Sequence, residues 1–161
     1  TTLAGNGSAG SNDGTGTAAS FQIPAVLRLD ADGNILLGDQ YNHKVRKITP
    51  AGIVTTVAGS GIQGHSDNVK NLAQFQFLTG IATDLEGNII VVDRDNNAIR
   101  RISKAGWVCT IAGKGPGQYG NSDGTGSNAS FRLPEGATVT RDGSIYIADY
   151  SNQSIRKIVI E

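Results

Sequence analysis

The sequence predicts an all-β protein in which a four-stranded antiparallel unit occurs three times, and three observations support this prediction. Short runs rich in Val, Ile, Thr and Tyr alternate with turn signals of Gly, Asn and Asp. One phrase, NDGTGTAASFQIP at 12–24, returns as SDNVKNLAQFQFL at 66–78 and as SDGTGSNASFRLP at 122–134. Glycine is abundant, at 22 of 161 residues, which suits a fold with many tight turns.

The repeat period follows from residues that keep one spacing along the chain. Phe21, Phe75 and Phe131 stand 54 and 56 residues apart. The two residues added in the last interval fall within KGPGQYGNSDG, which places an insertion in a loop. Two further sets keep the same spacing: Asp39, Asp93 and Asp149, and Arg46, Arg100 and Arg156. Self-similarity of this kind indicates a repeat architecture.

Four strands, a to d, account for each unit. In the first unit we expect them at about 26–30, 35–38, 44–48 and 53–58. Gly33 in the a–b turn supplies the positive φ that a tight hairpin needs, and Gly52 does the same between c and d. A four-stranded antiparallel sheet that returns in this way is typical of a β-propeller blade. Three blades cannot close a ring, so this chain is expected to be half of a six-bladed one.

The repeat units are expected at about 5–58, 59–112 and 113–161, within one propeller segment covering 1–161. Residues 1–4 match 55–58, so we expect them to be a lone outer strand that completes a blade. Two chains placed head to tail would then complete each other's open blade and close a six-bladed ring. A homodimer is therefore expected. Further blades in a longer natural chain are the alternative.

Two stretches resemble the NHL repeat: GIATDLEGNIIVVDRDNNAIRRI at 80–102 and EGATVTRDGSIYIADYSNQSIRKI at 135–158. The resemblance extends over essentially the whole chain. The first copy departs from it at Ala25 and Val26, where the repeat usually has Gly-Ile. NHL propellers are similar in fold and differ widely in function, so the resemblance implies a scaffold and no single activity.

Residues found at the same offset in every copy are interpreted as parts of the blade. The repeated arginines are expected partners for the repeated Asp39, Asp93 and Asp149 at the b–c turns. The repeated phenylalanines are expected to fill the seams between neighbouring blades. Asp13, Asp67 and Asp123 are expected to accept backbone N–H groups that hold the long d–a connection.

No catalytic residue, metal site or cofactor is predicted. Phosphate-binding motifs are absent, and no helix follows the DGTG loops. His43 and His65 lie in different loop types, and Cys109 aligns with Thr55 in strand d, so no zinc ligand set is expected. The stretch DADGN at 30–34 matches a hairpin turn better than a calcium loop. The alternative is a metal-dependent lyase or hydrolase of the NHL propeller type, with its site in the central channel.

Residues that differ between copies are the candidates for binding. Antiparallel order places the d–a loops and b–c turns on one face of the disk, here called the loop face. Tyrosines among mixed polar neighbours suit a binding surface, although exposed loop residues without a binding role would show the same pattern. Arg28, Thr79 and Glu135 are expected near the start of inner strands, toward the channel. The full candidate set is Arg28, Gln40, Tyr41, His65, Thr79, Arg94, Asp95, Tyr119, Glu135 and Tyr150.

Composition narrows the class of partner. Lys and Arg balance Asp and Glu at 14 each, and no basic stripe with interleaved aromatics is present, which counts against nucleic acid. No apolar run is long enough to cross a membrane as a helix, and the single cysteine excludes an internal disulfide. We expect a protein or glycan ligand, and an extracytoplasmic setting, either periplasmic, secreted or at the cell surface.

Overall fold

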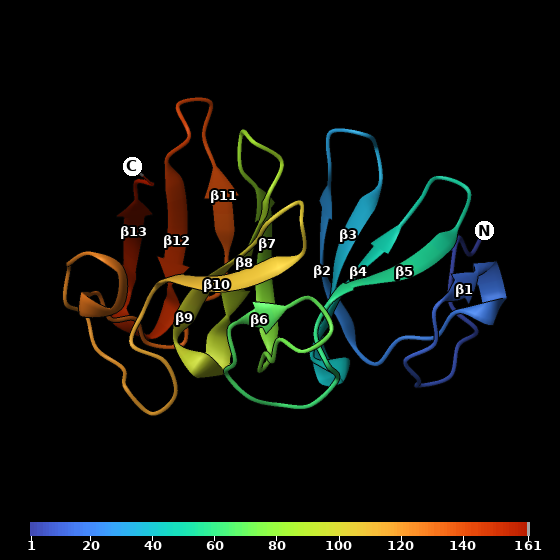
Figure 1. The fold of residues 1–161 in the computed structure, drawn as a ribbon, viewed down its shortest axis with the longest axis horizontal. Coiled ribbons are helices and arrows are strands. Elements are labelled where there is room, and N and C mark those ends of the chain that lie inside the picture. Colours follow the sequence, from blue (N-terminus) through green and yellow to red (C-terminus); the bar gives the residue numbers. More distant parts are fainter. Residues whose placement is uncertain (161) are drawn as a thin grey trace.

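The computed structural model describes residues 1–160, which form three antiparallel sheets arranged as successive blades (Figure 1). Blade 1 has the order β1-β5-β4-β3-β2 and blade 2 the order β6-β10-β9-β8-β7. Blade 3 has the order β11-β12-β13. The prediction of an all-β fold built from blades is confirmed.

The strands of blade 1 are β1 (Gly14–Thr15), β2 (Pro24–Leu29), β3 (Ile35–Asp39), β4 (Lys44–Ile48) and β5 (Ile53–Ala58). Those of blade 2 are β6 (Asn68–Val69), β7 (Leu78–Thr83), β8 (Ile89–Asp93), β9 (Ala98–Ile102) and β10 (Trp107–Ala112). Those of blade 3 are β11 (Ala137–Val139), β12 (Ile145–Asp149) and β13 (Ser154–Ile158). Short 3-10 turns complete the chain: η1 (Gly16–Ala18), η2 (Gln40–Asn42), η3 (Arg94–Asn96), η4 (Gly126–Asn128) and η5 (Tyr150–Asn152).

The expected strand bounds hold best where hydrophobic alternation is clear. In blade 1, β4 and β5 coincide with the predicted ranges, and β2 begins two residues early, at Pro24. All four expected strands occur in each of the first two blades, and each of these two sheets has one strand more. The DGTG phrase adds a fifth strand, since Gly14 pairs with Val54 on the outer edge of blade 1. A two-residue strand containing glycine has no alternation by which a sequence could reveal it.

The two faces of the arc differ in their connections. The β2–β3, β7–β8 and β11–β12 hairpins lie along the upper edge of Figure 1, and the long loops and the b–c turns lie along the lower edge. This lower edge is the loop face. The N-terminal and C-terminal ends lie at opposite ends of the arc. Residues 1–4, expected as an outer strand, form none in the single chain, because a strand needs a hydrogen-bonding neighbour and blade 3 lies at the far end.

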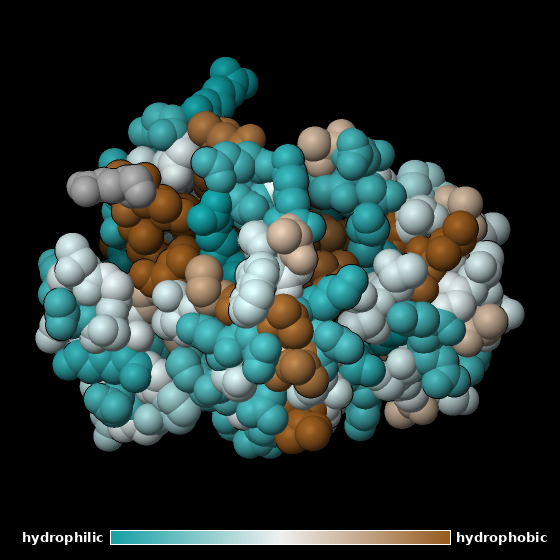
Figure 2. Space-filling model, in the orientation of Figure 1, coloured by the Kyte–Doolittle hydropathy of each residue, from teal (hydrophilic) through white to brown (hydrophobic). Residues whose placement is uncertain are grey.

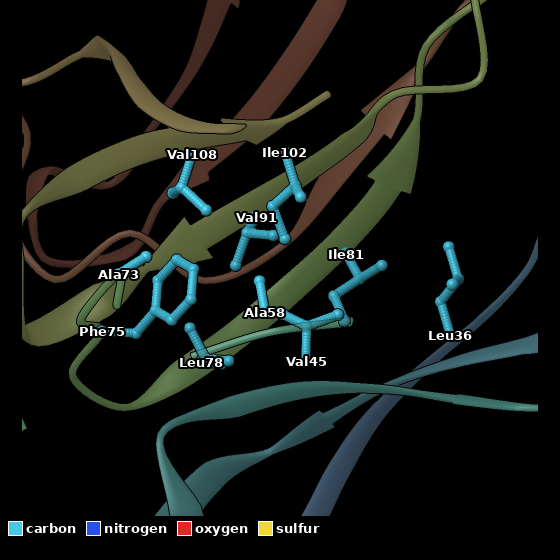
Figure 3. Packing of buried hydrophobic residues seen from close by; sticks show 10 residues of the cluster. All are labelled: Leu36, Val45, Ala58, Ala73, Phe75, Leu78, Ile81, Val91, Ile102 and Val108. Carbon is cyan, nitrogen blue, oxygen red and sulfur yellow. The ribbon is translucent and has the colours of Figure 1, made fainter. Parts of the chain in front are cut away.

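The core lies in the seams between blades. One cluster joins Leu36, Val45 and Ala58 of blade 1 to Phe75 and further residues of blade 2 (Figure 3). Its remaining members are Ala73, Leu78, Ile81, Val91, Ile102 and Val108. A second cluster places Phe131 between blades 2 and 3. The corresponding Phe21 packs only against blade 1 and stays partly exposed, because no blade precedes it in this chain.

Blades 2 and 3 approach each other so closely at Gly80 that a side chain would not fit there. A Cβ at Gly80 would collide with Glu135 O and would lie 3.0 Å from Ala137 N, both of them backbone atoms of the next inner strand region. At Gly136, the same offset in blade 3, the nearest atom would be the Ala148 Cβ at 3.8 Å. The absence of a side chain at 80 therefore lets two inner strands pack directly against each other.

A buried ion network recurs in every blade. In blade 2, Arg100 Nη1 donates to Asp93 Oδ2 at 2.7 Å and to Gln74 O at 3.0 Å, and Nη2 donates to Asp67 Oδ1 at 2.6 Å. The guanidinium lies 5.1 Å from the centroid of the Phe75 ring. The corresponding arginines of blades 1 and 3 make the same ion pairs. One arginine thus ties strand c, the b–c turn and the d–a loop together.

The loop aspartates hold the outer strands in the first two blades. Asp13 Oδ2 accepts the N–H of Thr56 at 3.0 Å, and the equivalent bond in blade 2 is made by Asp67. Burial raises the pKa of Asp67, but the backbone N–H of Thr110 and the Arg100 charge more than offset it and lower the pKa overall. Asp123 differs from the expectation. It pairs with Arg156 at 2.6 Å and accepts no outer-strand N–H, because residues 1–160 include no outer strand in blade 3.

Candidate functional site

A repeated hydrogen bond gives the loop face a fixed framework. Asn42 Nδ2, in the b–c turn of blade 1, donates to Gly10 O of the d–a loop at 2.7 Å. The equivalent bonds in blades 2 and 3 measure 2.8 and 2.6 Å. Each asparagine also donates to the buried aspartate of its own turn. The loops of all three blades are therefore held in one arrangement while their other side chains vary.

Five of the side chains on this framework form a cluster near the inner strands, here called the inner cluster: Tyr41, Phe77, Arg94, Asp95 and Glu135. The Tyr41 and Phe77 rings meet edge to face, with centroids 5.8 Å apart and planes at 67°. The Arg94 guanidinium lies 5.4 Å from the Phe77 ring centroid. Arg94 Nη1 pairs with Asp95 Oδ1 at 3.0 Å, and Nε lies 3.6 Å from Glu135 Oε1. The cluster thus crosses three blades.

The backbone explains how Phe77 reaches this position. Its φ is 59°, a left-handed conformation that a bulky residue rarely adopts. Ile23 and Leu133, at the same offset, also have positive φ values. In this conformation Phe77 O accepts the N–H of Arg94 at 3.2 Å, which fixes the start of the inner strand to the b–c turn. The left-handed backbone occurs at this offset in every blade, whereas an aromatic side chain occurs there only in blade 2.

Two of the predicted binding residues form hydrogen bonds across the seams between blades. Gln40 is buried, and its Nε2 donates to Leu78 O of the next blade at 3.0 Å. Thr79 is partly buried, and its Oγ1 donates to Pro134 O at 3.1 Å. These polar groups therefore already form hydrogen bonds between blades.

Arg28 and His65 lie away from the inner cluster. Arg28 was expected near the start of its strand, but it is next to last in β2 and pairs with Leu36 beside the a–b turn, on the opposite face. His65 Nε2 lies 3.4 Å from Thr110 Oγ1 of the outer strand. Burial, with a smaller effect of the Arg100 charge, lowers the pKa of His65, so the ring is neutral at pH 7.

A second group of side chains lies on the loop face of blade 3. Tyr119 and Tyr150 are 64% and 61% exposed, and the Arg132 guanidinium lies 5.2 Å from the Tyr119 ring centroid. We call these three residues the blade-3 patch. Sequence reasoning missed Arg132 and Phe77. The signal was present in both cases, since each differs in kind from the residues at its offset in the other copies.

Within residues 1–160, no three or more His, Cys, Asp or Glu side chains gather in an arrangement that could hold a metal ion. Burial raises the pKa of the exposed Cys109 thiol, which disfavours the thiolate. Within the same range, no helix is long and apolar enough to span a bilayer.

Fold and sequence together define the class: the chain forms β-propeller blades, and exposed residues that differ between blades lie on the loop face. Its third blade contains an NHL repeat. The family model for the NHL repeat matches residues 131–158, which contain the end of the third d–a loop and strands a to c of blade 3.

Known proteins that resemble the chain are considerably longer. The Arabidopsis thaliana protein SUPPRESSOR OF QUENCHING 1, chloroplastic, is 38% identical over 94 residues, which is 58% of this chain and 9% of the plant protein. A Bacteroides thetaiotaomicron protein of unknown function is 29% identical, with a TM-score of 0.78 over 84% of this chain and 34% of that one. An auxiliary nutrient binding protein from the same bacterium is 23% identical, with a TM-score of 0.73 over 83% of this chain and 36% of that one. The chain therefore spans less than a tenth of the plant protein and about a third of each solved structure.

Proposed function

We propose that the chain is a non-catalytic NHL scaffold that binds a protein or glycan ligand through its loop face, outside the cytoplasm. The observation that carries the proposal is the inner cluster, in which an aromatic pair, a cation and two carboxylates from three blades meet on a fixed framework. Tyr41 is 50% exposed, and the Arg94 side chain retains 23% exposure, so both remain accessible to a ligand. Tyrosine and arginine are enriched among the residues that dominate binding energies.

The positions that are constant between copies and those that vary have different surroundings, and this difference supports the same proposal. Residues common to all blades are engaged inside the molecule, as the buried Asp93 and Arg100 are. Residues that differ between copies, such as Tyr41 and Tyr150, occupy the 3-10 turns of the loop face and are exposed. A surface whose framework is constant and whose side chains vary is suited to specific recognition, whereas a catalytic role would require reacting groups that this face does not bring together.

The test is a triple substitution on the loop face. The wild-type chain is screened against an array of peptides and glycans, and the ligands it retains are then offered to a variant carrying Tyr41→Ala, Arg94→Ala and Tyr150→Ala. We expect the variant to lose these ligands and to keep its circular dichroism spectrum, because none of the three side chains packs in a seam cluster.

Trp107→Ala is the matched control, since Trp107 is 58% exposed on the outer strand of blade 2. It should retain every ligand. If the triple variant binds as the wild type does, or if Trp107→Ala abolishes binding, the site lies elsewhere. A tightly held stoichiometric metal in the purified protein would contradict the non-catalytic proposal and favour the lyase or hydrolase alternative.

We also propose that further blades cover the two outermost blade faces, supplied by the same natural polypeptide or by a second copy of this chain. Leu27 and Leu29 are 64% and 62% exposed on the outward face of blade 1. Ile155 of blade 3 is 72% exposed, at the offset where blade 2 buries Ile99 in a seam. Figure 2 shows hydrophobic surface over blade 3, at the left of the view. Apolar faces of this kind are normally covered.

The mass of the protein in solution tests this assembly directly. For residues 1–161 alone, light scattering should report twice the mass of one polypeptide, as expected if two copies close one six-bladed ring. A soluble, monodisperse species with the mass of a single chain would contradict the homodimer. The face of blade 1 offers a receiving surface, since a groove of about 880 Å³ is lined there by Phe21, Ile23 and Pro24 among others.

A further inference from the structure

The blade-3 patch is built on backbone geometry that all three blades share. Gly120 N donates to Phe131 O at 3.1 Å, Arg132 N donates to Asp149 Oδ1 at 2.8 Å, and Ser151 N donates to Arg132 O at 3.0 Å. The same three bonds occur in blade 1, at Gly10, Gln22 and Tyr41 respectively. The residues that carry the patch are therefore held next to one another by hydrogen bonds of the blade itself.

The side chains that this geometry displays change from blade to blade. At the three offsets, blade 1 has Ala9, Gln22 and Gln40, blade 2 has Gln63, Gln76 and Arg94, and blade 3 has Tyr119, Arg132 and Tyr150. Tyr119 also lies within the segment that holds the two-residue insertion of the third copy. In blade 3 the tyrosines at these offsets are exposed and the arginine stacks on one of them, so the change to two tyrosines and an arginine points to recognition.

Stacking on Tyr119 orients the Arg132 guanidinium, but within residues 1–160 no carboxylate pairs with it. It stacks 5.2 Å from the Tyr119 ring centroid and forms no side-chain hydrogen bond or ion pair with any other residue in 1–160. Arg94 contrasts with it, since two carboxylates already face that guanidinium. Stacking leaves the in-plane N–H groups of Arg132 free, and this planar fork matches a carboxylate in a bidentate arrangement.

We propose that the blade-3 patch binds an acidic segment of a protein, with a carboxylate on Arg132 and the adjacent chain lying against Tyr119 and Tyr150. This inference rests on the proposed function and specifies its ligand. Tyr119 and Arg132, stacked on each other, have the composition of protein hot spots, and the rings of Tyr119 and Tyr150 are each more than half exposed. Exposed rings of this size can cover the backbone of a peptide and the aliphatic parts of its side chains around the ion pair.

The test uses a fluorescein-labelled decapeptide of alternating Gly and Glu, followed by anisotropy at low ionic strength. Arg132→Gln should weaken binding at least about tenfold. Arg132→Lys should weaken it nearly as much, because a lysine cannot form the fork. Arg141→Gln is the matched control, since Arg141 is an exposed arginine in the a–b turn on the opposite face and should bind the peptide as the wild type does.

Several results would overturn the inference. These are no binding of the peptide, equal losses in Arg132→Gln and Arg141→Gln, or full retention in Arg132→Gln. Tighter Arg132-dependent binding of oligogalacturonate than of the peptide would assign the patch to an acidic glycan instead. If the triple variant loses its array ligands while Arg132→Gln binds the peptide normally, the loop-face function stands and this inference alone falls.

Discussion

Replacing Phe75 by alanine should destabilise the protein by about 3–5 kcal/mol, the usual cost of emptying a fully buried phenylalanine site. Phe75 is completely buried in the seam between blades 1 and 2 (Figure 3). The Arg100 guanidinium lies 5.1 Å from its ring centroid. The loss removes contacts to both blades at once, and the rigid strands on either side cannot close the space. Urea unfolding followed by tryptophan fluorescence measures the change.

The other copies provide the controls. Phe21→Ala should cost clearly less, because Phe21 has the same offset and the same cation above its ring but packs against one blade only. Tyr119→Ala should cost under about 1 kcal/mol, as an exposed side chain does. Equal losses for Phe75→Ala and Tyr119→Ala would show that repeated and variable positions do not correspond to core and surface.

Replacing Arg100 by methionine should cost a similar amount, about 3–5 kcal/mol, because it leaves the Asp93 carboxylate buried without its cation. Both side chains are fully buried, and their N–O distance is 2.7 Å. Arg101→Met on the same strand is the control. Arg101 pairs with Glu86, whose side chain is 75% exposed, and with Asp84 at 3.3 Å. Because the Arg101 side chain itself stays 27% exposed, its replacement should cost clearly less, about 1 kcal/mol.

The pH dependence of the Arg100→Met variant has a definite sign. Burial raises the pKa of Asp93 to about 6, against the lowering effect of Arg100, and removing the cation raises it further. A carboxyl whose pKa is higher in the folded than in the unfolded state favours folding when protonated, and this stabilisation is lost as pH rises through the folded pKa. The stability deficit of the variant should therefore shrink between pH 8 and pH 5. A deficit that grows toward pH 5 would contradict this account of the network.

The repeat made most of the fold predictable. Strand positions such as β4 and β5 follow from alternation and turn glycines, and the seam positions of Phe75 and Phe131 follow from their presence in every copy. The fifth strand of blades 1 and 2 was missed because β1 and β6 are held by edge hydrogen bonds, with no pattern of burial to reveal them.

The candidate site was predicted less completely, for physical reasons. Comparing copies separates constant from variable positions, but variation does not distinguish an exposed residue from one that fills a seam. Gln40 varies and yet bonds across the seam to Leu78, whereas its neighbour Tyr41 is exposed. The difference of Phe77 from Ile23 and Leu133 marks it as a variable position, but the left-handed backbone that brings its ring beside Arg94 is one that its residue type disfavours.

The most direct test of the account is hydrogen–deuterium exchange of the chain with and without the ligands retained on the array. Binding should slow exchange in the b–c turns at 40–42, 94–96 and 150–152 and in the inner-strand entries at 132–135. Exchange in the a–b turns at 30–34, 84–88 and 140–144 should stay unchanged, because those turns lie on the opposite face. Protection confined to the a–b turns or to the outer strands would contradict the loop face as the binding surface.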